Sequence, residues 1–237
     1  MLNNVSILIP YKPDGGPRDR LFNWVKTYYE TMMPEVELCI GKSLSHPFNR
    51  SRAINIAAKQ ATRDIFVIAD GDVFYEPDSL LQAIELLDQH AWVIPYDKWL
   101  DLTQSSTENL LIHPPQLPLP LDVEYSKERK YKNNRLPISG TIIVTRENFY
   151  KVRGFDERFK GWGKEDNAFC AAMNTICGPY YRTKNTFLYH LWHPREGLKT
   201  HPNMQNNIKL FNRYAKRTGK IGEMTKLINE RGHNSSF

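Results

Sequence analysis

The sequence has few cysteines and no long apolar run. Its three cysteines, Cys39, Cys170 and Cys177, lack the spacing of metal ligands, which argues against a disulfide framework and favours a reducing compartment. No apolar run approaches the roughly 18 residues that a membrane span needs. The apolar stretch from Val5 to Pro10 is too short for a signal peptide and has no basic leader. We therefore expect a cytoplasmic protein without a membrane span.

The composition indicates one globular domain with a basic surface. Hydrophobic residues make up 41% and aromatic residues 12% of the 237 residues, which is enough apolar material for a buried core. We see no internal repeat or linker and expect a single domain over residues 1–237. The net charge of +6 suits acidic partners such as nucleotide diphosphates, nucleic acid or anionic membranes. An ordinary solvated basic surface explains the charge equally well.

Short β-branched runs alternate with helical patterns in the first hundred residues. We expect strands at 5–9, 35–40, 65–69 and 92–95, and helices at 21–32, 50–60 and 77–87. This order predicts an α/β fold with a mixed, mostly parallel central sheet flanked by helices. Ligands of such sheets bind beyond the carboxyl ends of the strands, where Pro10–Lys12 and Asp70–Asp72 lie.

The second half begins with a different pattern. Residues 97–137 are polar, contain five prolines and show little periodicity, so we expect a long, mobile loop. A strand at 141–145, a helix at 165–174 and strand structure at 180–191 follow. A basic amphipathic helix over 208–228 is expected within a C-terminal helical extension at 205–231.

Two carboxylates follow the buried run that ends at Ala69, in the segment Asp70-Gly71-Asp72. Cleavage of a nucleotide-sugar donor builds charge on its leaving diphosphate, and a bridging divalent cation neutralises that charge. Mg²⁺ and Mn²⁺ both accept carboxylate oxygens as ligands, and Gly71 lets the backbone approach a ligand closely. The alternative is a simple turn, for which Asp-Gly-Asp is ordinary chemistry.

A second candidate segment reads Gly161-Trp162-Gly163-Lys164-Glu165-Asp166. The two glycines predict an open backbone that presents the indole, and an aromatic face is a suitable platform for a sugar ring. Glu165 and Asp166 begin a predicted helix, where a carboxylate can act as general base toward an acceptor hydroxyl. The competing interpretation is structural, because acidic residues in the first turn complement the helix dipole.

His190 and His193 are candidates for metal ligands because imidazole is a common ligand of transition metals. A turned segment would present both rings to one ion. An extended strand would direct them to opposite faces, so that only one could bind. The spacing leaves both arrangements open.

Four segments in order resemble the GT-A glycosyltransferases, in particular the catalytic domains of β-1,4-galactosyltransferases and bacterial chondroitin-polymerase-type transferases. Ile9-Pro10-Tyr11-Lys12 is similar to an Ile-Pro-Phe-Arg strand end, and Phe48–Asn55 to a Phe-Asn-Arg-Ala-Lys-x-x-Asn helix start. Asp70–Asp72 resembles the Asp-Val-Asp metal motif. Gly154-Phe155 with Gly161–Asp166 resembles Gly-Phe followed by Gly-Trp-Gly-Gly-Glu-Asp, the most specific of the four. The resemblance covers residues 5–195.

This resemblance implies a role for each candidate residue. Asp166 would be the catalytic base, with Glu165 beside it at the sugar site. Asp72 and His193 would bind Mn²⁺ or Mg²⁺, and His190 stands where the galactosyltransferases have a methionine ligand. The UDP-sugar would be bound by the remaining residues: Pro10, Tyr11, Lys12, Arg18, Arg20, Phe48, Arg50, Asp70, Gly71, Trp162 and Gly163.

Two further departures from the family pattern affect the donor and acceptor sites. Lys164 replaces the second glycine of the Gly-Gly pair. The insertion at Pro13–Pro17 displaces the opening arginines, so the pattern leaves open whether Lys12, Arg18 or Arg20 meets the phosphates.

The resemblance implies a metal-dependent, inverting glycosyltransferase that moves a sugar from a UDP-sugar to an acceptor hydroxyl. A saccharide is the default acceptor. The basic charge and the missing membrane anchor motivate an alternative, a hydroxymethylated base in DNA, which an enzyme would have to extrude from the duplex. A non-catalytic nucleotide-sugar-binding module and a metal-dependent nuclease are rivals from other classes, and the sparse acidic cluster argues against the nuclease.

Overall fold

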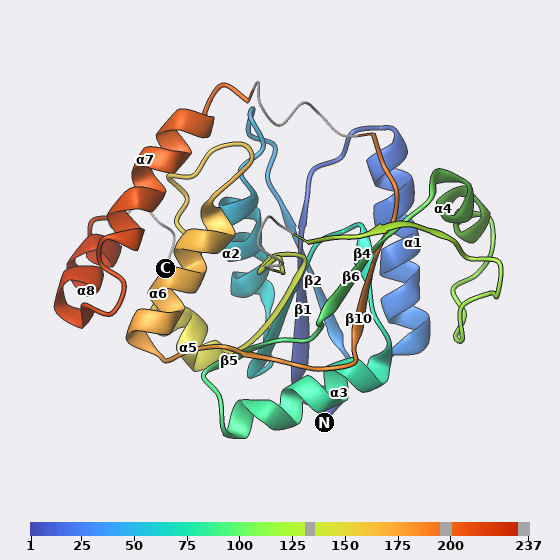
Figure 1. Cartoon of the computed structure of the whole chain (residues 1–237), viewed down its shortest axis with the longest axis horizontal. Coiled ribbons are helices and arrows are strands. Elements are labelled where there is room, and N and C mark those ends of the chain that lie inside the picture. The colour runs from blue at the N-terminus through green and yellow to red at the C-terminus, as the bar shows by residue number, and fades with distance from the viewer. Residues whose placement is uncertain (131–135, 195–200, 232–237) are drawn as a thin grey trace.

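The structure is a computed structural model that describes residues 1–130, 136–194 and 201–231. In this part of the chain two β-sheets lie at the centre and helices cover them (Figure 1). Helices α1 and α4 lie on one side of the sheets, while α6, α7 and α8 pack together on the other (Figure 1). None of the helices in the described part is long and apolar enough to cross a membrane.

The larger sheet has six strands in the order β2-β1-β3-β8-β5-β9. Strand β1 runs parallel to β2 and β3, β8 runs antiparallel to β3 and β5, and β9 runs parallel to β5. The expected mixed α/β architecture is therefore confirmed. The strands are β1 (Val5–Tyr11), β2 (Glu37–Lys42), β3 (Ile65–Ala69), β5 (Trp92–Ile94), β8 (Thr141–Thr145) and β9 (Tyr181–Arg182).

A smaller sheet has the order β4-β10-β6-β7. Strand β10 is antiparallel to β4 and parallel to β6, and β6 is antiparallel to β7. Its strands are β4 (Val73–Phe74), β6 (Lys98–Leu102), β7 (Tyr125–Glu128) and β10 (Phe187–His190). Strand β4 directly follows the Asp70–Asp72 segment, and its pairing with β10 brings the end of β10 to that segment.

The helices begin where local capping chemistry favours them. Pro17 and Pro77 occupy first-turn positions of α1 and α3, where a missing N–H costs nothing, and the Asn49 side chain caps α2 by accepting from Arg52 N at 2.9 Å. The helices are α1 (Pro17–Met32), α2 (Arg50–Gln60), α3 (Pro77–Glu85), α4 (Gln104–Leu111), α5 (Arg146–Lys151), α6 (Glu165–Ile176), α7 (Met204–Ala215) and α8 (Ile221–Asn229), with short 3-10 turns at Leu2–Asn4 and Leu86–Asp88.

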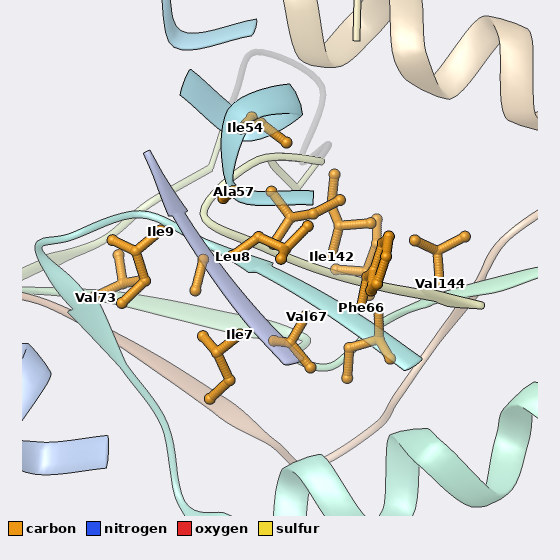
Figure 2. Packing of buried hydrophobic residues seen from close by; sticks show 14 of the residues in the cluster. Ile7, Leu8, Ile9, Ile54, Ala57, Phe66, Val67, Val73, Ile142 and Val144 are labelled. Atoms are coloured by element: carbon orange, nitrogen blue, oxygen red, sulfur yellow. The ribbon is translucent and has the colours of Figure 1, made fainter. Parts of the chain in front are cut away.

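The core lies between the larger sheet and its helices. Strand β1 is buried on both faces, as its continuous apolar run predicts. Figure 2 shows side chains of β1, β3 and β8 packed with Ile54 and Ala57 of α2. This packing fixes the carboxyl ends of β1 and β3, which carry the segments Ile9–Lys12 and Asp70–Asp72.

Two expectations about the second half were wrong. The stretch 97–137 contains β6, α4 and β7, because β6 pairs with β10 and α4 contacts α1, whereas the sequence of the stretch follows no simple period. Residues 131–135 lie outside the described part, and mobility of the stretch stays a prediction. The helix expected at 208–228 is two helices, α7 and α8, since the chain turns at residues 216–219 with Gly219 at φ +78°.

Candidate active site

The smaller sheet brings both histidines to Asp72. Strand β10 pairs with β4 so that His190 lies opposite Val73, and Leu191 N donates to the Asp72 carbonyl at 2.9 Å. The chain leaves the strand after His190, so His193 is not held on the opposite face. The arrangement with both rings on one side is therefore the one that forms.

Asp72, His190 and His193 place one oxygen and two nitrogens within 4.8 Å of one another. His193 Nε2 lies 3.3 Å and His190 Nε2 3.9 Å from Asp72 Oδ2. A mixed set of imidazole and carboxylate donors favours a divalent transition metal such as Mn²⁺ over Mg²⁺, which prefers oxygen ligands. The residues present therefore fit a divalent transition metal.

The charges of this cluster support each other. Burial alone would raise the pKa of Asp72, but the hydrogen bond from His193 and the charges of His190 and Arg18 outweigh it and hold that pKa well below its usual range. In turn, the hydrogen bond to Asp72 raises the pKa of His193 despite its burial. A carboxylate that stays ionised is the form that ligates a cation.

Asp101 orients His190 from behind. This buried carboxylate on β6 lies 3.1 Å from His190 Nδ1 and accepts from Trp99 Nε1, also at 3.1 Å. Arg129 pairs with the same carboxylate. When His190 is neutral, this nearby carboxylate favours the tautomer with hydrogen on Nδ1, which leaves the Nε2 lone pair facing Asp72, as a metal ligand requires. Although burial opposes it, contact with His190 and Arg129 holds the pKa of Asp101 well below its usual range.

Arg50 joins the first motif to the second. Its guanidinium donates to Asp70 Oδ1 through Nε at 2.8 Å and to Asp166 Oδ1 through Nη1 at 2.7 Å. Burial would lower the pKa of Arg50, but the two carboxylates raise it above its ordinary value. One cation at the start of α2 therefore fixes Asp166 relative to the carboxyl end of β3.

Glu165 and Asp166 have different environments at the start of α6. Glu165 is buried and accepts from Gly163 N at 3.0 Å, and burial together with the Asp166 charge raises the pKa of Glu165 to about 7. The Asp166 side chain retains 15% exposure and is paired with Arg50. Asp166 is thus the carboxylate that a bound molecule can reach, while Glu165 supports the glycine loop.

Trp162 projects from that loop. Its side chain is 52% exposed, which is unusual for so large an aromatic residue. Gly161 and Gly163 have φ of +70° and +110°, and a Cβ at Gly161 would lie 1.8 Å from His201 Cε1. Both the backbone conformation and the space therefore require glycine at position 161.

The predicted nucleotide residues gather at the ends of β1 and β3. Tyr11 stacks on Phe22 at 3.9 Å between ring centroids and donates to Asp19. Gly71 packs against the same ring, since a Cβ there would lie 3.3 Å from Phe22 Cδ2. Pro10 is buried beside Tyr11 on β1.

The three candidates for binding the phosphates, Lys12, Arg18 and Arg20, make different contacts. Arg18 approaches Asp72 at 3.9 Å, whereas Lys12 donates to the Ser45 carbonyl at 3.5 Å and Arg20 is exposed on α1. Arg18 is therefore the one of the three that the structure brings to the metal cluster. Phe48 is half-buried, and its carbonyl accepts from Gly161 N at 3.0 Å, which links this segment to the Trp162 loop.

A cavity of about 450 Å³ opens beside the two histidines. It extends from the metal cluster over β6 and β7, and residues of the stretch 97–137 form much of its wall. Its lining comprises Asp101, Leu102, Thr103, Gln104, Ser126, Lys127, His190, Trp192, His193 and Pro194.

Sequence reasoning missed Asp101 and Arg129, together with Asn207 of α7. The first two lie in the stretch interpreted as a loop. In β6 the buried Trp99 and Asp101 alternate with half-buried Lys98 and Leu100, but the residue types Lys-Trp-Leu-Asp-Leu do not alternate between polar and apolar, so the sequence showed no strand signal there. Asn207 lies on α7 with its side chain against the Trp162 loop, and one asparagine in a polar helix carries no local signal.

Comparison with known proteins supports this fold. Residues 120–194 match the family described as the N-terminal domain of galactosyltransferase. A Drosophila β1,4-galactosyltransferase 7 mutant, solved with manganese, UDP-Gal and xylobiose, is 17% identical, with a TM-score of 0.55 over 86% of this chain and 78% of that chain. TarS of S. aureus, solved with UDP-GlcNAc, is 14% identical, with a TM-score of 0.54 over 96% of this chain and 71% of that chain.

A third neighbour, glucosyl-3-phosphoglycerate synthase from Mycobacterium tuberculosis, is 14% identical, with a TM-score of 0.51 over 91% of this chain and 80% of that chain. No curated protein sequence matches the chain. The comparisons confirm the expected GT-A fold and support the expected enzyme class.

Proposed function

We propose that this GT-A-fold chain is a metal-dependent, inverting glycosyltransferase that moves a sugar from a UDP-sugar to a hydroxyl group of a saccharide. The observation that carries the proposal is that Arg50 binds both Asp166, a carboxylate that a ligand can reach, and Asp70. Asp70 lies two residues before Asp72, which lies together with two histidines. Transfer of a sugar needs a site for the leaving diphosphate and a base for the incoming hydroxyl.

The donor side would hold the UDP-sugar against the ends of β1 and β3. Asp72, His190 and His193 would bind Mn²⁺, which would neutralise charge on the departing diphosphate. Arg18 adds a positive charge at the same place. In support, one structural neighbour was solved with manganese and UDP-Gal, another with UDP-GlcNAc, and a third with Mn²⁺ and UDP.

The acceptor side would use Trp162 and Asp166. The exposed indole would stack on the sugar ring, and Asp166 would take the proton of the acceptor hydroxyl. The hydroxyl oxygen would then bond to the anomeric carbon from the face opposite the diphosphate, while the bond from that carbon to the phosphate oxygen breaks and UDP leaves with the electron pair. A single displacement of this kind inverts the anomeric configuration.

A saccharide acceptor is favoured over a base in DNA. The Drosophila neighbour was solved with xylobiose, and an exposed tryptophan on a glycine loop suits a sugar ring. Among the described residues the basic side chains of α7 and α8 lie on the outside of the molecule, and no contact places them beside Asp166.

The test is release of UDP from a panel of UDP-sugars, with Mn²⁺ and with a chelator, and with candidate saccharides screened as acceptors by mass spectrometry. We expect transfer that needs Mn²⁺ and inverts the anomeric centre. Asp166→Asn should lower transfer by at least about 100-fold, the usual contribution of a general base, and retain UDP binding.

The matched control is Asp78→Asn, because Asp78 is an exposed acidic residue in the first turn of α3. If the acidic residues served only the helix dipole, the two variants would behave alike. Equal transfer by wild type and Asp166→Asn would remove the base assignment, and transfer that survives the chelator would remove the metal.

A further inference from the structure

The Trp162 loop is held from outside by the C-terminal helix α7. Asn207 donates through Nδ2 to the carbonyls of Lys160 and Trp162, at 3.1 and 3.3 Å, and its Oδ1 accepts from Lys160 N at 3.4 Å. Asn207 is 2% exposed, although it lies on a helix whose other residues are mostly partly exposed. One buried amide therefore serves three backbone groups of the loop.

The loop otherwise has few backbone partners among the described residues. Its glycine conformations prevent regular structure, and apart from Asn207 the loop is held by Gly161 N donating to the Phe48 carbonyl and by Gly163 N donating to Glu165. Buried backbone groups without partners cost free energy. Removal of the Asn207 amide would leave two carbonyls and one N–H without a partner unless water binds them, and the loop could then adopt other conformations.

Helix α7 and His201, which precedes it in the chain, cover the loop with side chains. His201 fills the space above Gly161, and Met204 lies 3.1 Å from where a Cβ at Gly163 would be. The ammonium group of Lys164 lies over the Phe211 ring at 5.5 Å from its centroid. His201 and helix α7 thus cover the loop from residue 161 to 164, while the indole of Trp162 remains exposed.

We infer that Asn207 is a positioning residue that fixes Trp162 for the acceptor sugar. The acceptor sugar in this inference rests on the proposed function, whereas the hydrogen bonds by which Asn207 holds the loop do not depend on it. Asn207 touches neither Asp72 nor Arg50, so its loss should change acceptor binding and leave the donor side intact. The C-terminal helical extension would then be part of the acceptor site.

The experiment compares Asn207→Ala with Asn206→Ala, a control at the neighbouring position whose side chain is exposed on the same helix. Hydrogen exchange measured by mass spectrometry should become faster at residues 160–163 in Asn207→Ala alone. With the best acceptor of the screen above, KM for the acceptor should rise about tenfold, as expected for the loss of one or two net hydrogen bonds. KM for the UDP-sugar and hydrolysis of the donor by water should stay within about twofold.

If Asn207→Ala does not fold, Asn207→Asp replaces it in the experiment. Aspartate has the size of asparagine and keeps an acceptor for Lys160 N, but it lacks the NH₂ group that donates to the two carbonyls. Unchanged exchange at 160–163, or an equal rise of both KM values, would overturn the inference. A wild-type protein without any transfer would instead overturn the proposed function, and the exchange result would still show whether Asn207 holds the loop.

Discussion

Replacing Asp101 by asparagine should weaken metal binding although Asp101 is not a metal ligand. The wild-type carboxylate lies 3.1 Å from His190 Nδ1, and it accepts hydrogen bonds from Trp99 and Arg129. An asparagine side chain has one acceptor oxygen, and its NH₂ group would face hydrogen-bond donors where the second carboxylate oxygen lies. His190 would lose the partner that fixes its ring and tautomer.

The size of the effect follows from the geometry. Loss of a partner behind a ligating histidine lowers metal affinity about 10- to 100-fold, which corresponds to about 1.4–2.8 kcal/mol. The variant should also lose stability, because Arg129, with 24% side-chain exposure, keeps its charge without its buried partner. For one broken, mostly buried pair we expect a loss of about 3 kcal/mol.

The assay is Mn²⁺ affinity by titration calorimetry on folded protein, with urea unfolding measured in parallel. Asp97→Asn is the control, since Asp97 accepts from Asn185 N and Thr186 N at 2.9 and 3.0 Å and makes no contact with the histidines. It should cost stability but leave Mn²⁺ affinity unchanged. A folded Asp101→Asn protein with Mn²⁺ affinity within twofold of wild type would refute the role given to Asp101.

Two further predictions concern the start of α6. Because the pKa of Glu165 is raised from 4.5 to about 7, its favourable contribution is complete below pH 4.5 and is lost as the pH rises through 7, so the stability of Glu165→Gln relative to wild type should increase by up to about 3 kcal/mol between pH 4.5 and pH 8; a difference independent of pH in urea unfolding would contradict this. Lys164 has φ +77°, a left-handed conformation that strains every residue type except glycine. Neither Lys164→Gly nor Lys164→Ala can contact Phe211, so the two variants differ mainly in this strain, and Lys164→Gly should be about 1 kcal/mol more stable than Lys164→Ala. Equal stability of the two variants would show that the backbone is not strained there.

Local patterns were enough for the elements and motifs of the first hundred residues. Strands β1 and β3 form buried apolar runs, and α2 begins at its Asn49 cap. Each of these signals acts within a few residues of the chain, so the order of strands and helices could be read from the sequence. The open backbone around Trp162 was also predicted from Gly161 and Gly163, because glycine readily adopts the positive φ that both residues have.

The stretch 97–137 could not be predicted in this way. Strand β6 pairs with β10 and β7, and its residues face partners from distant parts of the chain. Asp101 is buried because Arg129 and His190 satisfy its charge there. A carboxylate in a polar stretch is ordinarily exposed, and no local pattern distinguishes this one.

The sequence by itself determined which chemical groups are present and in what order: a carboxylate pair after a strand, a glycine loop with tryptophan, a carboxylate pair at a helix start, and two histidines. Only the tertiary structure decided which of them meet. The pairing of β10 with β4 brings His190 and His193 together at Asp72, Arg50 connects Asp70 with Asp166, and α7 holds the Trp162 loop. These contacts depend on strand register and helix packing between segments far apart in the chain, which spacing along the sequence does not encode.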